Sequence, residues 1–236
     1  MASSWRAAAD GLAADLARVF GTRLRSVCVY GAHVDGNGAD APITCLALVS
    51  SLTPLDLDAC GRAVHGWHRH GLATPLILPE QEFARSLDAF PLEYAEMQRA
   101  HAHVYGHNPF DGLTIAREDL RRACETQVKS HLLHLREEYL EAAGRPLAVA
   151  ELVQASAPGF AALIRNVARL HDVDHRDRAT ATREGARLAG LPDGILADVL
   201  ALEQPAGVTT NDPARLFPEY LAAVEQLARF VDTWRA

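Results

Sequence analysis

The sequence has no excess of positive charge and little cysteine, and each of these features excludes a class of protein. Lys129 is the single lysine among 23 basic residues, and 30 acidic residues give a formal net charge of −7. This balance predicts no binding of nucleic acid or of an acidic membrane through bulk charge. The four cysteines form no C-x-x-C pair and show no metal-ligand spacing. A disulfide scaffold is therefore excluded, and buried, reduced thiols are expected.

Long hydrophobic segments are also scarce. The continuous apolar runs are short, which predicts that no helix spans a membrane. Near the N-terminus Asp10, Asp15 and Arg18 interrupt the apolar stretch, so we expect no signal peptide there. Hydrophobic residues make up 49% of the 236 residues and charged residues 22%, which is the mixture of a folded globular chain. The sequence predicts a cytoplasmic protein with one large domain or two ordinary ones.

The periodicity of the apolar residues changes near Gly112, which predicts two lobes, residues 1–112 and 113–236. In the first lobe, helical patterns over 2–20 and 54–70 alternate with short apolar segments. The segments predicted as strands are 24–30, 43–49, 75–78 and 90–97. Continuous apolar strands need cover on both faces, and two helices cover only one. We therefore expect the second face of the sheet to be partly open.

Only helical patterns follow in the second lobe. Thr114 is a predicted N-cap of a long helix that ends at Gly144 and Pro146. Further helices are expected over 148–155, 158–171, 178–190 and 193–203, and a last one begins at Asp212 and Pro213. Short links between helices predict antiparallel neighbours. The predicted fold class is α+β, a mixed α/β lobe followed by an all-α helical bundle.

A glycine-rich turn joins the first two predicted strands. Strand 24–30 runs into Gly31 and Ala32, Gly36 follows in the turn, and strand 43–49 begins a short loop later. This arrangement resembles the nucleotidyltransferase superfamily, with its polymerase-β-like fold and C-terminal helical domain. In that superfamily a strand leads to a Gly-Ser turn, a second strand carries an Asp-x-Asp pair, and a later strand supplies a third carboxylate. The resemblance implies a nucleotidyltransferase-like lobe at residues 1–112.

The resemblance also implies a role for each part of the site. Nucleotidyl transfer uses Mg²⁺ ions, which prefer carboxylate oxygens. Glycine in the turn lets backbone N–H groups approach phosphate oxygens closely. By this resemblance the ligand-binding residues are Gly31, Ala32, Gly36 and Thr44, and Glu93 on the later strand is the catalytic carboxylate.

The sequence departs from the superfamily at the metal-binding positions. Thr44 and Leu46 stand where the two aspartates are expected, and Ala32 replaces the serine of the turn. Glu93 alone cannot hold two hard cations, so we expect no metal and no other cofactor. The favoured function is a catalytically degenerate member that acts as a ligand-binding, regulatory or protein-interaction module.

Two alternatives stay open. One is an active, Mg²⁺-dependent nucleotidyltransferase that moves a nucleoside monophosphate to a hydroxyl acceptor and uses Glu93 with Asp35 or Asp40. Glycines beside these two aspartates favour a turn-capping role for them instead. The other alternative is an antitoxin-like helical interaction protein whose α/β lobe is only a scaffold. The implied partner is a nucleotide, another small molecule or a protein.

Histidines gather in three places. Those at 65–70 lack neighbouring cysteine or carboxylate ligands, so we expect no zinc there. The segment 171–175 resembles the His-Asp pair of metal-dependent phosphohydrolases, but a solvated helix exit is favoured. If the first lobe binds a ligand, Arg99, His101, His103 and His107 are expected near it.

Overall fold

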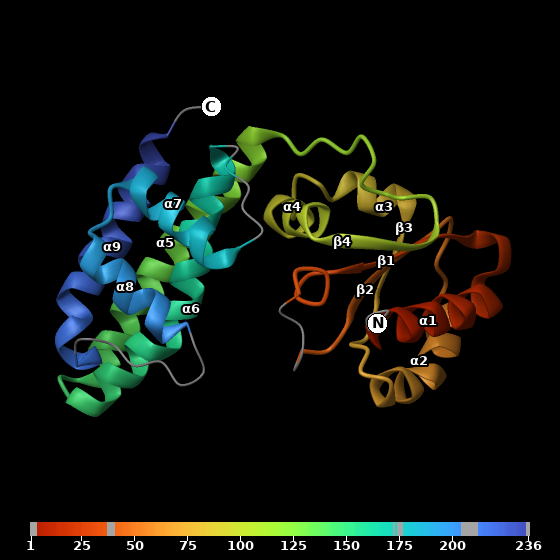
Figure 1. The fold of residues 1–236 in the computed structure, drawn as a ribbon, viewed down its shortest axis with the longest axis horizontal. Coiled ribbons are helices and arrows are strands. Elements are labelled where there is room, and N and C mark those ends of the chain that lie inside the picture. Colours follow the sequence, from red (N-terminus) through yellow and green to blue (C-terminus); the bar gives the residue numbers. More distant parts are fainter. Residues whose placement is uncertain (1–3, 37–40, 172, 174–176, 204–211, 235–236) are drawn as a thin grey trace. The chain divides into compact units, whose positions relative to one another are not determined.

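The computed structural model describes the whole chain except residues 1–3, 37–40, 172, 174–176, 204–211 and 235–236. The chain divides into two compact units, Met1–Ile115 and Ala116–Ala236 (Figure 1). The predicted fold class is confirmed, because the first unit holds a mixed four-stranded sheet with helices and an all-helical region follows.

The sheet of the first unit has the strand order β3-β2-β1-β4. Its strands are β1 (Leu24–Tyr30), β2 (Thr44–Val49), β3 (Leu76–Pro79) and β4 (His101–Gly106). β1 is antiparallel to β2 and β4, whereas β2 and β3 are parallel. The register pairs Tyr30 with Thr44 and with His101, and it pairs Cys28 with Leu46. Because side chains alternate along a strand, these five residues share one face of the sheet.

Helices cover both faces of this sheet (Figure 1). They are α1 (Ser4–Phe20), α2 (Pro54–Arg69), α3 (Glu80–Arg85) and α4 (Pro91–Arg99), with a 3₁₀ turn η1 (Gly21–Arg23) after α1. Leu16 of α1 belongs to a buried cluster with Val27 and Val29 of β1. On the opposite face, Phe83 of α3 and Tyr94 of α4 belong to a second buried cluster. The expectation of a partly open second face is therefore wrong, because α3 and α4 supply its apolar cover.

The prediction of a strand over 90–97 is also wrong, because most of this segment forms α4. Pro91 occupies the first turn of the helix, where a backbone N–H would have no intrahelical partner. Leu92, Tyr94 and Met97 are buried, whereas Phe90 is half exposed. The fourth strand is β4, later in the chain, so Glu93 lies on a helix and not on a strand.

The second unit consists of helices in the part of the chain that the structure describes. They are α5 (Arg117–Ala142), α6 (Pro146–Leu170), α7 (Arg178–Ala189), α8 (Asp193–Leu202) and α9 (Pro213–Thr233). The predicted N-cap Thr114 is wrong, because α5 begins after Ala116, whose side chain makes no capping bond. The predicted break between 155 and 158 is also wrong, because α6 continues through Pro158.

α6 is long and apolar enough, by length and composition, to cross a membrane, contrary to the prediction from the sequence. Three of its large side chains, Val153, Phe160 and Ile164, are almost completely buried in the structure. The core helix of a helical bundle passes the same test of composition. This helix is therefore weak evidence for a membrane span.

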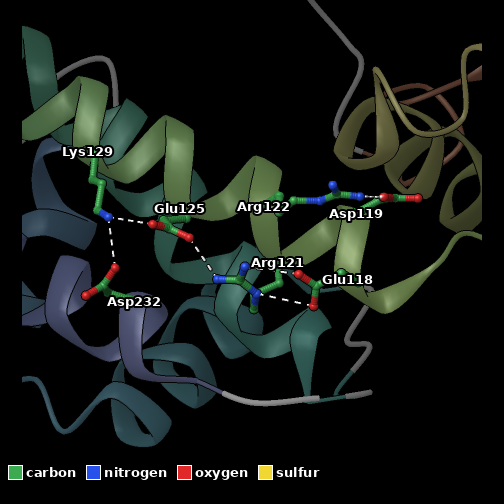
Figure 2. A network of polar contacts seen from close by, with 7 residues as sticks. All are labelled: Glu118, Asp119, Arg121, Arg122, Glu125, Lys129 and Asp232. Atoms are coloured by element: carbon green, nitrogen blue, oxygen red, sulfur yellow. Dashed lines mark hydrogen bonds and ion pairs between the residues drawn. The ribbon is translucent and has the colours of Figure 1, made fainter.

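A series of ion pairs runs along α5 and reaches α9 (Figure 2). Arg121 donates hydrogen bonds to Glu118 and to Glu125, the latter at 2.7 Å. Lys129 binds Glu125 and also Asp232, whose Oδ1 lies 2.8 Å from Nζ. The hydrogen bond from Lys129 lowers the pKa of Asp232, and the two carboxylates raise the pKa of Lys129. The single lysine of the chain thus connects α5 to α9.

Gly185 permits the close approach of α7 to α6, and this makes its substitution a test of the packing. A Cβ atom on Gly185 would lie 2.0 Å from the carbonyl oxygen of Ile164. We predict that Gly185→Ala lowers the free energy of unfolding by about 1–3 kcal/mol because the backbones must move apart. Chemical denaturation of wild type and variant measures the difference.

Gly194→Ala is the matched control, since nothing lies within 4 Å of a Cβ atom at that position of α8. Its free energy of unfolding should stay within about 1 kcal/mol of wild type. Equal denaturation midpoints for Gly185→Ala and wild type would contradict the packing described for α6 and α7.

Candidate functional site

The turn that follows β1 is closed by backbone hydrogen bonds. Gly31 and Gly36 have φ of 80° and 82°, in the left-handed region that favours glycine. The N–H groups of Val34 and Asp35 donate to the carbonyl oxygen of Gly31 at 2.9 and 3.2 Å. The N–H of Gly31 donates to the carbonyl oxygen of Ala100 at 2.8 Å, which anchors the turn to the end of α4.

The structure brings together several of the predicted ligand-binding residues. A Cβ atom on Gly31 would lie 3.5 Å from Oγ1 of Thr44, so the two residues are neighbours. The Thr44 hydroxyl donates to the carbonyl oxygen of Tyr30 at 2.6 Å. Ala32 follows Gly31 in the turn and is half-buried, whereas Gly36 lies at the other end of the turn and is exposed. Gly31, Ala32 and Thr44 therefore form one small region at the end of β1.

Leu46 occupies the second of the two positions that the resemblance assigns to aspartate. Its side chain is 1% exposed and lies in the buried cluster with Cys28, Phe83 and Tyr94. Burial raises the pKa of the Cys28 thiol to about 11, as expected for a site with little water. A carboxylate at position 46 would be desolvated among these side chains.

Asp35 is held by a guanidinium at the end of α4. Nη2 and Nη1 of Arg99 lie 2.5 and 3.1 Å from the two carboxylate oxygens of Asp35. Arg99 also donates to Oε1 of Glu96 at 2.8 Å. The Arg99 and Asp35 side chains are only 8% and 4% exposed. Both oxygens of Asp35 are thus engaged in a buried ion pair that ties the glycine turn to α4.

The other predicted carboxylates lie elsewhere. Glu93 is exposed in the first turn of α4, and Asp40 lies outside the described residues. β4, the strand that replaces the predicted one, reads His-Ala-His-Val-Tyr-Gly and carries no carboxylate. Among the residues that the structure describes, no group of three or more His, Cys, Asp or Glu side chains is placed to hold a metal ion.

The histidines expected near a ligand separate in the structure. His101 pairs with Tyr30 in the register of β1 and β4, and its ring contacts that of Phe110 in a tilted arrangement with centroids 4.5 Å apart. His107 instead approaches Glu80, with Nε2 and Oε1 3.4 Å apart. In the segment 171–175, residues 172 and 174–175 lie outside the described residues.

Sequence reasoning placed Arg99 near a ligand but missed its bond to Asp35. The two residues are 64 positions apart in the chain, and no local pattern connects them. The only nearby signal is Glu96, three residues before Arg99 and on the same side of α4. That signal predicts a helical ion pair and says nothing about the turn.

The comparisons with known proteins give one kind of match. No family model and no curated protein matches the sequence. Among solved structures, the crystal structure of spectinomycin adenyltransferase AAD(9) from Enterococcus faecialis, with ATP and spectinomycin, matches with a TM-score of 0.56. The match covers 94% of this chain and 97% of that chain at 12% sequence identity. The chain has a nucleotidyltransferase fold. At this identity the likeness shows the fold alone and assigns no residue a role.

The buried ion pair makes a quantitative prediction. Arg99→Leu leaves the Asp35 carboxylate buried without its guanidinium, so we expect the free energy of unfolding to fall by about 3–5 kcal/mol. The double variant Arg99→Leu with Asp35→Leu removes both charges and should be more stable than Arg99→Leu alone. Chemical denaturation of the variants in parallel measures both differences.

Arg122→Leu serves as the control, because Arg122 pairs with Asp119 on α5 with a side chain that is 63% exposed. Loss of that pair should cost less than about 1 kcal/mol. If Arg99→Leu cost no more than Arg122→Leu, the ion pair would not hold the glycine turn.

Proposed function

We propose that this chain is a nucleotidyltransferase-fold protein that has lost two-metal nucleotidyl transfer and acts as a ligand-binding module. The supporting observation is the position of Leu46, which is buried in the apolar cluster under α3 and α4. Thr44, at the other aspartate position, offers one hydroxyl oxygen, and that hydroxyl already donates to Tyr30. These two side chains do not fit a pair of hard cations, which require several carboxylate oxygens.

Among the residues that the structure describes, the carboxylates near the turn do not replace the missing pair. Asp35 and Glu96 both bind Arg99, so the guanidinium already occupies the two oxygens of Asp35 and one oxygen of Glu96. A Mg²⁺ ion at Asp35 would have to displace a guanidinium that is almost completely buried. Stabilisation of developing charge is often the largest single term in catalysis, and the described residues place no group of carboxylates that could hold a metal ion for it. The supported function is therefore binding without nucleotidyl transfer.

The ligand class follows from the fold and from the turn. The matched structure is that of an adenyltransferase with ATP and spectinomycin, so a nucleotide or a small polar molecule is the natural candidate for this chain. Gly31 carries no side chain and lies beside the Thr44 hydroxyl, which leaves room for a polar group of a ligand. We expect nucleotide binding at this turn to be weak and independent of Mg²⁺.

An incorporation assay tests the loss of transfer. Labelled ATP is incubated with the full chain, Mg²⁺ or Mn²⁺ and a panel of hydroxyl acceptors that includes spectinomycin. We expect no incorporation above that of Glu93→Ala, because no described carboxylate cluster holds the metal ions. Robust incorporation that Glu93→Ala abolishes would overturn the proposal in favour of an active nucleotidyltransferase.

A binding titration tests the second half of the proposal. Calorimetry with ATP in EDTA and in Mg²⁺ should give the same affinity, and Thr44→Val, which removes the hydroxyl at nearly constant volume, should weaken it. Thr233→Val is the matched control, because that hydroxyl donates only to carbonyl oxygens within α9. If no nucleotide binds and the native mass exceeds 25.6 kDa, an interaction protein becomes the better explanation.

A further inference from the structure

α6 contains two consecutive residues that weaken a helix. Pro158 lies inside the helix, where it has no N–H to donate and its ring crowds the preceding turn. Gly159 follows it, and glycine is a poorer helix former than alanine. Two residues that destabilise the same turn of the helix require a compensating contact or function at that place.

Packing does not supply the reason at Gly159. A Cβ atom there would meet only the ring of His131 on α5, at 3.7 Å, which is an ordinary van der Waals contact. Gly185 differs, since a Cβ atom there would lie 2.0 Å from a carbonyl oxygen. An alanine would therefore fit at Gly159, and what the glycine provides is open space beside His131.

This space is part of a hollow of about 250 Å³ between α5 and α6. His131, Ser156 and Gly159 line it together with the apolar side chains of Leu135 and Leu152. Leu135 and Leu152 are buried, so the hollow offers an apolar wall beside polar groups. Small-molecule sites commonly combine these two features.

A buried tyrosine holds the polar groups of the hollow in place. Ser156 Oγ donates to the hydroxyl of Tyr220 at 3.0 Å, and that hydroxyl lies 3.5 Å from Nε2 of His131. Tyr220 is completely buried. Because Ser156 donates to it, the Tyr220 hydroxyl can donate to Nε2, which leaves the proton of the neutral ring on Nδ1. Nδ1 is one of the two ring atoms nearest to the gap at Gly159.

The charge around the hollow is negative. The titratable side chains that line it are Glu138, His131 and His134 of α5. Burial, and to a smaller extent His134, lower the pKa of His131, which leaves that ring neutral at pH 7. A shallower depression shares Glu138 and adds Glu141, Glu151 and Arg145. The Arg145 guanidinium donates to the carbonyl oxygens of Ala142 and Glu141. Three carboxylates against one engaged guanidinium favour a cationic ligand.

We propose that the hollow between α5 and α6 binds a small amine that carries a hydroxyl group at its other end. The ammonium group pairs with Glu138, the hydroxyl group exchanges hydrogen bonds with His131 and Ser156, and the carbon body packs against Leu135 and Leu152. All of these residues belong to the second unit. The inference is therefore independent of the function proposed for the glycine turn.

Three probes of nearly the same shape separate the contributions. Tyramine, 4-ethylphenol and 4-hydroxyphenylacetate carry the same phenol with a positive, a neutral and a negative tail. We expect saturable binding of tyramine to the full chain, with NMR shift changes at the His131 imidazole, weaker binding of 4-ethylphenol, and the weakest binding of 4-hydroxyphenylacetate. No saturable tyramine binding, or the reverse order of affinity, would overturn the proposal.

Matched variants locate the binding. Gly159→Leu fills the hollow and should weaken the binding of tyramine at least about tenfold, as expected when a ligand loses its cavity. Glu138→Gln should weaken tyramine about twofold to fivefold, the range for an exposed ion pair, and leave 4-ethylphenol unchanged. Gly194→Ala on α8 and Glu137→Gln, on a different side of α5, should bind all probes like wild type.

Gly159→Ala keeps the test decisive if Gly159→Leu does not fold. An alanine meets only an ordinary contact there and favours the helix, so this variant should fold and still bind tyramine more weakly than wild type. Unchanged tyramine affinity in a folded Gly159→Leu or Gly159→Ala variant would show that the probe binds elsewhere and would refute the assignment.

Discussion

The buried ion pair between Arg99 and Asp35 determines what the glycine turn can do. It joins the loop after β1 to the end of α4, and the N–H of Gly31 adds a bond to Ala100 at the same place. A divalent cation that took Asp35 as a ligand would leave a guanidinium buried with only Glu96 as a described acidic partner. Charge compensation by Arg99 and charge compensation by a metal are therefore alternatives in this turn, and the fold is built around the first.

The apolar cluster on the same face of the sheet has a related consequence. Leu46 contributes to the cover under α3 and α4 together with Phe83 and Tyr94. An aspartate at this position would place a carboxylate where the Cys28 thiol already has a pKa raised to about 11 by burial. An aspartate in place of Leu46 would thus cost fold stability unless the helices moved away. Apolar packing under α3 and α4 and a carboxylate at position 46 are therefore incompatible in this arrangement of the helices.

Prediction from the sequence succeeded where a long continuous segment carried a clear pattern of apolar residues. β1 and β2 could be predicted because each is a continuous apolar run bounded by turn residues, and the helices of the second unit have clear periodicity. The segment 90–97 was wrongly predicted as a strand because Phe90, Leu92 and Tyr94 alternate with other residues. That alternation covers only five residues, and Pro91 marks the start of a helix. β4 was missed because an edge strand rich in histidine lacks the apolar signature. The other features, including the partner of Asp35, depend on tertiary contacts between residues that are far apart in the sequence.

Glycine within the helices of the second unit illustrates the same limit. Gly159 and Gly185 both lie inside continuous helices, and the sequence does not show which of them a neighbouring helix crowds. Their neighbours do, because a carbonyl oxygen crowds Gly185 while Gly159 faces an imidazole ring across open space. Gly185 allows two helices to pack closely, whereas Gly159 leaves a hollow whose hydroxyl and imidazole groups are fixed by Tyr220. Gly159 weakens its helix without improving the packing, and we explain it by the ligand that the open volume can hold. The carboxylates around this volume favour a cation.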